Sequence, residues 1–173
     1  AARSIGLKLS HEELAAMADL RLSDEPAQIF PGIWTSGEIR ERPEFIGSSP
    51  RHMIQEKKDY IPDPYRDDLS LALETPSGMV VVCGCCHAGL LNTLMHVQKV
   101  FKKDIRAVVG GTHLAGVSED SLDRTVALLP SICNGIPNLY LNHCSGERAS
   151  AFLAQAFPGK VQPCLAGTVL ILE

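Results

Sequence analysis

Three apolar segments of this 173-residue chain end in the same way, with glycine or another small residue followed by histidine. These segments are Val82–Gly89, Val109–Leu114 and Leu141–Gly146. A short apolar run bounded by glycine is typical of a buried strand, and glycine permits tight turns and close backbone approach. The carboxyl ends of strands in an α/β sheet meet at one edge, where ligands gather. We therefore expect His87, His113 and His143 to converge at one edge of a sheet.

From Asp67 onward the hydrophobic pattern alternates between strands and helices. Residues 69–73 and 79–83, joined by a Pro-Ser-Gly turn, predict a hairpin. Apolar residues at helical spacing predict helices over 90–100, 118–130 and 149–157. Further strands are expected at 105–109 and 139–141, followed by a final strand pair at 161–165 and 168–172. This alternation predicts an α/β fold for residues 67–173.

Residues 1–66 form a second, irregular region. Ser10 and Glu13 have the spacing of a capping box and predict one short helix. The segment from Arg40 to Arg66 is polar and rich in proline, which excludes long regular elements. We interpret this segment as an ordered surface loop or lid, with disorder as the alternative.

Composition excludes two classes of partner. The 16 Lys and Arg residues are outnumbered by 20 Asp and Glu residues, so the chain has no basic excess for binding nucleic acid. Its apolar runs fall short of the ~18 residues of a membrane helix. Three of the six cysteines lie within Cys83–Cys86, which favours reduced thiols near a site and a cytoplasmic location. Cys83, Cys133 and Cys164 are expected to be small buried hydrophobic residues.

The histidines after the strands favour a metal site. Neutral imidazoles supplied by separate segments are suitable metal ligands, and three histidines in one context point to His87 and His143 as ligands with His113 beside them. His11, His52 and His96 lack this context and are expected to be surface or packing residues. Cys85, Cys86 and Cys144 lie next to the expected ligands. Asp68 either adds a carboxylate to the same edge or belongs to an Asx turn before the strand.

Residues 83–87 also contain Cys-x-x-Cys-His, the attachment pattern of c-type haem. Thioether attachment requires both cysteines on an accessible loop, whereas Cys83 ends a predicted buried strand. A zinc ribbon is excluded because the chain has no second Cys-x-x-Cys pair.

Residues 29–173 resemble the C-terminal part of metal-dependent hydrolases of the metallo-β-lactamase superfamily, in the branch labelled dihydropterin–ribofuranosyl-aminobenzene-phosphate synthase-like. Five groups of residues carry the resemblance: Pro31-Gly32-Ile33 with Ser36-Gly37-Glu38-Ile39, Asp67-Asp68-Leu69, Gly84-Cys85-Cys86-His87-Ala88-Gly89 with Asn92, Gly110-Gly111-Thr112-His113-Leu114, and His143-Cys144-Ser145-Gly146.

The resemblance implies the C-terminal half of an αββα sandwich with a metal site at one edge. It implies that His87 and His143 are metal ligands and that His113 lies close to the metal or the substrate. Cys85, His87 and Asp68 are the alternatives for the position of the usual bridging carboxylate. The implied cofactor is one or two Zn²⁺ ions, with Mn²⁺ or iron as alternatives.

One superfamily signature, His-x-His-x-Asp-His, is absent from the sequence. In the superfamily this motif belongs to the N-terminal half of the fold. We therefore expect the chain to pair with that half as a separate piece, or with another copy, because half a sandwich exposes an apolar face.

Two functions remain as hypotheses. The first is a metal-dependent hydrolase component that uses activated water on a phosphoester or related bond of a small molecule, with His113 and Asp68 as catalytic residues and the loop from Arg40 to Tyr65 over the substrate. The second is a non-catalytic binding or regulatory module with an incomplete metal site.

Overall fold

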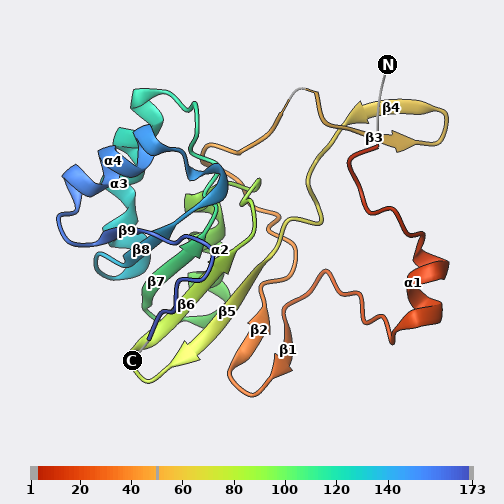
Figure 1. Cartoon of the computed structure of the whole chain (residues 1–173), viewed down its shortest axis with the longest axis horizontal. Coiled ribbons are helices and arrows are strands. Elements are labelled where there is room, and N and C mark those ends of the chain that lie inside the picture. Colours follow the sequence, from red (N-terminus) through yellow and green to blue (C-terminus); the bar gives the residue numbers. More distant parts are fainter. Residues whose placement is uncertain (1–3, 50, 172–173) are drawn as a thin grey trace.

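A seven-stranded mixed sheet is the centre of the computed structural model, which describes residues 4–49 and 51–171. Its strands lie in the order β1 (Ala27–Phe30), β2 (Ile33–Thr35), β5 (Ser70–Thr75), β6 (Gly78–Cys83), β7 (Ile105–Gly110), β8 (Asn138–Leu141) and β9 (Val161–Pro163) (Figure 1). The pairs from β1 to β6 are antiparallel, and β6, β7, β8 and β9 are parallel. The predicted hairpin at 69–83 is therefore present, and the α/β fold class is confirmed.

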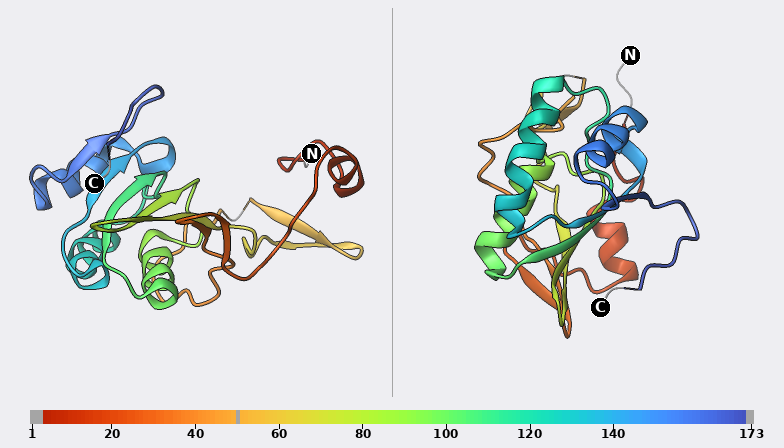
Figure 2. Two further views of the ribbon diagram at one scale, coloured as in Figure 1. Left: turned by 90° about the horizontal axis from the view of Figure 1, so that it is seen from below. Right: turned by 90° about the vertical axis from the view of Figure 1, so that its left-hand side faces the viewer.

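Helices α2 (Leu90–Phe101) and α3 (Glu119–Cys133) cover one face of the sheet (Figure 2). Helix α4 (Glu147–Ala156) packs against α3 and β9. The helices contribute apolar side chains at helical spacing, and the strands contribute every second residue. The largest fully buried members of this core are Met79, Leu94, Ile105, Leu122, Leu129, Leu139 and Leu153. None of the described helices is long and apolar enough to span a bilayer.

The opposite face of the sheet carries two rows of side chains that run across the strands. The strand register aligns the rows Ile33–Leu73–Val80–Ala107–Asn138 and Thr35–Leu71–Val82–Val109–Tyr140. The C-terminal segment crosses this face in Figure 1, and Ile171 shares a small pocket with Val80 and Ala107. Val82 and Val109, at the middle of the second row, remain partly exposed. We call these two rows the open sheet face.

Within the N-terminal region, residues 27–35 form β1 and β2 of the sheet, whereas the segment with α1 and the hairpin β3–β4 extend away from the body (Figure 1). Helix α1 (His11–Met17) begins at Ser10, and the predicted capping box with Glu13 is present. Residues 40–66, expected to be a loop, contain a two-stranded hairpin of β3 (Met53–Glu56) and β4 (Asp59–Pro62). The prolines flank these strands or end them, so a short hairpin fits between them.

Two boundaries differ from the sequence expectation. Helix α3 continues past Pro130 for one turn, where the Ser131 hydroxyl donates to the Leu128 carbonyl and Asn134 ends the helix in a left-handed conformation. The expected strand pair at 161–172 is wrong, because the described part of 168–172 adds no strand. Cys164 donates its N–H inward to Leu141. By alternation Pro163 faces the outer edge of β9, where it has no hydrogen to donate to another strand.

Candidate metal centre

The loops after β6, β7 and β8 meet at one edge of the sheet, as the sequence predicted. Gly111 N–H donates to the Gly84 carbonyl, and Asn142 N–H donates to the Gly110 carbonyl, each at 3.1 Å. Ala115 N–H donates to the carbonyl of Cys144, also at 3.1 Å. These bonds extend the sheet pattern beyond the strands. The side chains on the three loops are therefore held by backbone hydrogen bonds.

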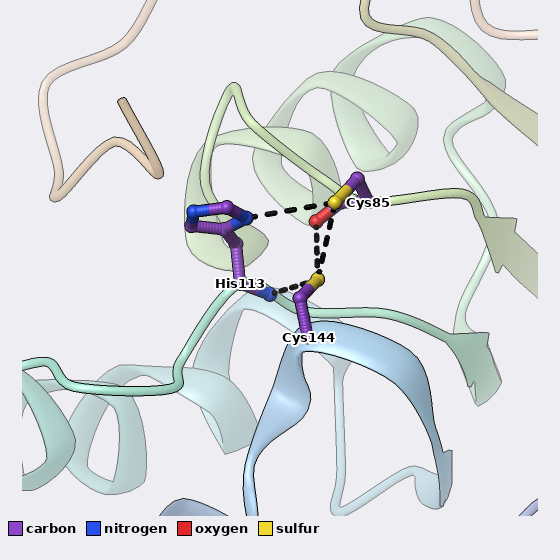
Figure 3. A group of neighbouring side chains, drawn as sticks. All are labelled: Cys85, His113 and Cys144. Carbon is purple, nitrogen blue, oxygen red and sulfur yellow. Dashed lines mark hydrogen bonds between the residues drawn. The ribbon is translucent and has the colours of Figure 1, made fainter. Parts of the chain in front are cut away.

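Cys85, His113 and Cys144 point toward one another at this edge (Figure 3). Their donor atoms all lie within 4.8 Å of one another, and we call these three residues the thiol centre. The Cys85 sulfur lies 3.3 Å from the Cys144 sulfur and 3.6 Å from His113 Nδ1. His143 borders the centre, with Nε2 3.3 Å from the Cys85 sulfur.

This geometry fits a tetrahedral zinc ion. Zinc–sulfur bonds of about 2.3 Å and zinc–nitrogen bonds of about 2.0–2.1 Å place tetrahedral ligands about 3.8 Å (S to S) and about 3.6 Å (S to N) apart. The observed 3.3 Å and 3.6 Å are within a small adjustment of these values. Two thiols with imidazole are also the donor types that zinc prefers. The residues present therefore fit the metal that the fold family implies.

Without a cation, the surroundings of Cys85 and His113 favour the neutral forms of both groups. Burial, with the hydrogen bond to Cys144, raises the pKa of Cys85 to about 12. Burial and the neighbouring His87 lower the pKa of His113, so its imidazole stays neutral over a wider pH range. A bound cation reverses this preference for the thiol, because it stabilises the thiolate.

Strained backbone conformations gather around the centre. Seven described residues other than glycine have positive φ, and four of them are Tyr65 (48°), Cys86 (62°), His113 (50°) and His143 (50°). Such conformations cost on the order of 1–3 kcal/mol each and persist where the surroundings fix them. Their concentration at one edge of the sheet marks it as the functional region.

His87 lies beside the thiol centre and has one ring nitrogen fixed. Its Nδ1 lies 2.7 Å from the Gly47 carbonyl, and Gly47 N–H donates to the His87 carbonyl at 2.8 Å. Tyr65 stacks on the His87 ring at 4.4 Å and 10°, and the His113 ring is 4.4 Å away on centroids. Because the Gly47 carbonyl accepts a hydrogen bond from Nδ1–H, the Nε2 lone pair is available to bind a metal, as in metal-binding histidines.

Asp68 lies outside the thiol centre. Its carboxylate accepts from Ala88 N–H at 2.7 Å, which ties the His87 loop to the segment before β5. Asp68 also lines a cavity of about 740 Å³ together with Asp67, Tyr65 and His87. The carboxylate therefore does not form an Asx turn with Ser70, whose N–H donates to the Ser36 hydroxyl, and its role as a site carboxylate stays a prediction.

The other cysteines and histidines occupy different surroundings. Cys83 and Cys86 are 6% and 2% exposed, which leaves no accessible pair for haem attachment. Cys133 is buried as expected, but Cys164 is half-buried because it follows the edge strand β9, so its predicted burial is wrong. His96 Nε2 bonds the Ser36 carbonyl at 2.8 Å, a packing role.

Two features were missed by sequence reasoning. Tyr65 comes from an irregular segment 22 residues before His87, and nothing in the local pattern indicates that it stacks there. Cys144 was noted only as a neighbour of His143, although its sulfur belongs to the centre. The pattern of small residues at a strand end predicts which residues lie in the loop, but it does not predict the direction in which each side chain points.

Gly111 makes the close approach of two loops at the centre possible. A Cβ at this position would lie 2.5 Å from the Gly84 carbonyl oxygen and 2.9 Å from the Cys144 sulfur. We expect Gly111→Ala to lower zinc affinity at least tenfold and to cost about 1–3 kcal/mol of unfolding free energy. Zinc titration against a chromophoric chelator and urea unfolding measure the two effects.

Gly84→Ala is the matched control, because a Cβ at Gly84 meets nothing within 4 Å. Equal zinc affinity in Gly111→Ala and the wild type would contradict the role of this close approach.

Comparison with known proteins agrees with the fold. No family profile matches the chain. It is 27% identical over 154 residues to the 7,8-dihydropterin-6-methyl-4-(β-D-ribofuranosyl)-aminobenzene-5'-phosphate synthase of Methanocaldococcus jannaschii, covering 86% of this chain and 51% of that protein. It is 30% identical over 144 residues to an uncharacterised protein of the same organism, covering 83% and 52%. The chain thus spans about half the length of the curated relatives it matches.

Comparison with a solved structure also supports this fold. The crystal structure of a metal-dependent hydrolase of the β-lactamase superfamily matches with a TM-score of 0.79 and 26% identity, over 87% of this chain and 57% of that one. The sequence and structural likenesses cover most of the chain and include all three loops of the metal centre. The chain has the fold of the metallo-β-lactamase superfamily, and its sequence is similar to that of a dihydropterin–ribofuranosyl-aminobenzene-phosphate synthase over about half of that protein.

Proposed function

We propose that this chain is a component of a metal-dependent hydrolase that acts on a phosphoester or related bond of a small molecule. The observation that carries the proposal is the convergence of Cys85, His113 and Cys144 from three loops, with His143 at the border. A solved structural neighbour is itself a metal-dependent hydrolase, which supports the reaction class.

The proposed site residues divide into metal ligands and catalytic residues. Cys85, His143 and His87 are the proposed ligands, and Cys144 adds a sulfur that the sequence did not assign. When bound, a divalent ion supplies Lewis acidity and lowers the pKa of water toward ~7. Two sulfur donors favour Zn²⁺ over the alternatives Mn²⁺ and iron, because thiolate is a soft ligand.

His113 and Asp68 are the proposed catalytic residues. His113 Nδ1 also belongs to the thiol centre, so His113 has the catalytic role where His143 and His87 supply the imidazole ligands. His113 presents a neutral imidazole, since burial lowers its pKa, and it can donate a proton only after receiving one. Asp68 lines the cavity of about 740 Å³ beside His87, which we propose as the entrance for a small substrate. The hairpin β3–β4 borders this cavity through Met53, Ile54 and Tyr60.

We further propose a partner that completes the site, either a polypeptide carrying His-x-His-x-Asp-His or a second copy of this chain. The observation behind it is the middle of the open sheet face, where the apolar side chains of Val82 and Val109 are partly exposed. A location in the cytoplasm fits a site with adjacent free thiols.

The alternative is a binding or regulatory module without catalysis. It is favoured by the donor set itself, because structural zinc sites are typically closed by cysteine and histidine. One of the relatives is a synthase, so bond formation on a related substrate is the second reaction to assay.

The decisive experiment compares three histidine variants. We expect His87→Ala and His143→Ala to lower zinc-dependent hydrolysis of bis-nitrophenyl phosphate more than about 100-fold, because each removes a ligand. His96→Ala, which loses only the bond to Ser36, should stay near the wild-type rate. The assay uses zinc-loaded chain, alone and with the polypeptide that carries the signature.

Equal loss in all three variants would indicate misfolding and remove the support for specific ligands. Zinc binding by the chain without hydrolysis under either condition would favour the binding module.

A further inference from the structure

Two free thiols meet at the metal centre although they are 59 residues apart in the sequence. The sulfur atoms of Cys85 and Cys144 lie 3.3 Å apart, and both side chains are partly exposed. A disulfide bond is about 2.05 Å long, so closing it requires the sulfurs to approach by about 1.3 Å.

The pair differs from the three buried cysteines in its access to solvent, and Cys164, which is also partly exposed, lies outside the centre. Cys83 and Cys86 also hydrogen-bond to each other, but they are 6% and 2% exposed. Cys133 is fully buried. An oxidant in solution therefore reaches Cys85 and Cys144 before it reaches the buried pair.

We propose that Cys85 and Cys144 form a redox-active dithiol that small disulfides such as oxidised glutathione convert to an intramolecular disulfide, which removes both sulfur donors from the metal centre. Closure of this disulfide requires neither a substrate nor turnover, but its competition with zinc rests on the proposed metal site.

The reaction proceeds by two thiol–disulfide exchanges. The deprotonated sulfur of one cysteine attacks a sulfur of oxidised glutathione, the bond between the two glutathione sulfurs breaks, and one glutathione leaves. The sulfur of the second cysteine then attacks the protein sulfur of the mixed disulfide, and the second glutathione leaves. The protein loses two electrons and two protons, and oxidised glutathione gains them as two molecules of glutathione.

The surroundings of the two sulfurs act in opposite directions: burial raises the pKa of Cys85 to about 12, which slows attack by its sulfur, whereas two neighbouring contacts assist the exchange. His143 Nε2 lies 3.3 Å from the Cys85 sulfur and His113 Nδ1 lies 3.6 Å from it, so an imidazole can accept the thiol proton. The Cys144 sulfur accepts the His113 backbone N–H at 3.3 Å, a bond that stabilises negative charge on it.

Metal and oxidant compete for the same two sulfur atoms. A metal held by Cys85 and Cys144 occupies the lone pairs that attack the disulfide. The metal-free chain should therefore close readily, and the zinc-loaded chain should resist. Because a disulfide can be reduced again, the effect is reversible and couples metal binding to the thiol redox state.

The test counts thiols in the full chain with and without zinc. Chain stripped with a chelator is incubated with millimolar oxidised glutathione, and free thiols are titrated under denaturing conditions. We expect the metal-free chain to lose two of its six thiols, and peptide mass mapping to join Cys85 to Cys144. The zinc-loaded chain should keep all six, and the oxidised chain should bind no zinc until dithiothreitol is added.

Two cysteine variants test which residues form the disulfide. Cys144→Ser should keep a single glutathione on Cys85 instead of closing, whereas Cys164→Ser, outside the centre, should close as the wild type does. If Cys144→Ser does not fold, the peptide map of the wild-type chain decides alone. A map that joins Cys83 to Cys86, or a metal-free chain that keeps six thiols, would overturn the proposal. Equal closure with and without zinc would overturn the competition between metal and oxidant.

Discussion

Cys144→Ser is expected to reduce the zinc affinity of this chain more than about 100-fold. Loss of a residue that only supports a metal ligand typically costs 10–100-fold, so the loss of a direct ligand costs more. The Cys144 sulfur lies 3.3 Å from the Cys85 sulfur and belongs to the cluster with His113. A serine hydroxyl is a poor zinc ligand at neutral pH because it keeps its proton.

Competition with a chromophoric chelator measures the affinity, and elemental analysis after gel filtration gives the stoichiometry. Cys164→Ser is the matched control, since Cys164 is also partly exposed but lies after β9, outside the cluster. Far-ultraviolet circular dichroism of each variant tests the fold. Unchanged zinc binding in Cys144→Ser would show that the metal uses the histidines without this sulfur.

This prediction separates two ligand sets that the sequence could not distinguish. From the sequence, His87, His143 and Cys85 were the expected ligands. The structure brings Cys85, His113 and Cys144 together, places His143 beside Cys85, and directs His87 toward Tyr65 and Gly47. If His87 is a ligand, it acts through Nε2 at the margin of the centre.

The sequence predicted the order of strands and helices well because the chain uses local signals there. Ser10 with Glu13 defines the start of α1, and Ser118 caps α3 by accepting from Ser121 N–H. The run Met79–Cys83 is buried within the sheet, and glycine follows it where the loop turns. Each of these signals acts over a few residues, so it can be read without the rest of the fold.

Features that depend on distant contacts could not be predicted in this way. Tyr65 adopts a positive φ because several bonds fix it: its N–H donates to Asp63, and its hydroxyl accepts from Ser49 N–H. The hairpin β3–β4 forms between prolines that favour irregular structure. The last expected strand failed because Pro163 blocks the outer edge of β9, a consequence of register that the residue pattern does not contain.

The largest effect on assembly is expected from a charge on the open sheet face. Val82 and Val109 lie opposite each other at the middle of this face and are partly exposed. Leu165, Val169 and Ile171, in the segment that crosses the face, are 70%, 84% and 86% exposed. Each ~400 Å² of apolar surface removed from water is worth on the order of 10 kcal/mol, comparable with the stability of a domain.

We therefore expect the wild-type chain to sediment at micromolar concentration as an assembly, with a second copy or a co-purifying polypeptide on this face. Val109→Lys should dissociate the assembly, because an unpaired lysine in an apolar interface costs several kcal/mol, equivalent to roughly 1000-fold in the dissociation constant. Ala127→Lys is the control, since Ala127 is exposed on α3, on the helical side of the sheet. Sedimentation velocity with mass spectrometry of each species identifies what is bound. A wild-type chain that sediments as a monomer and unfolds cooperatively would show that the C-terminal segment closes the face by itself, and the proposed partner would then have no surface to occupy.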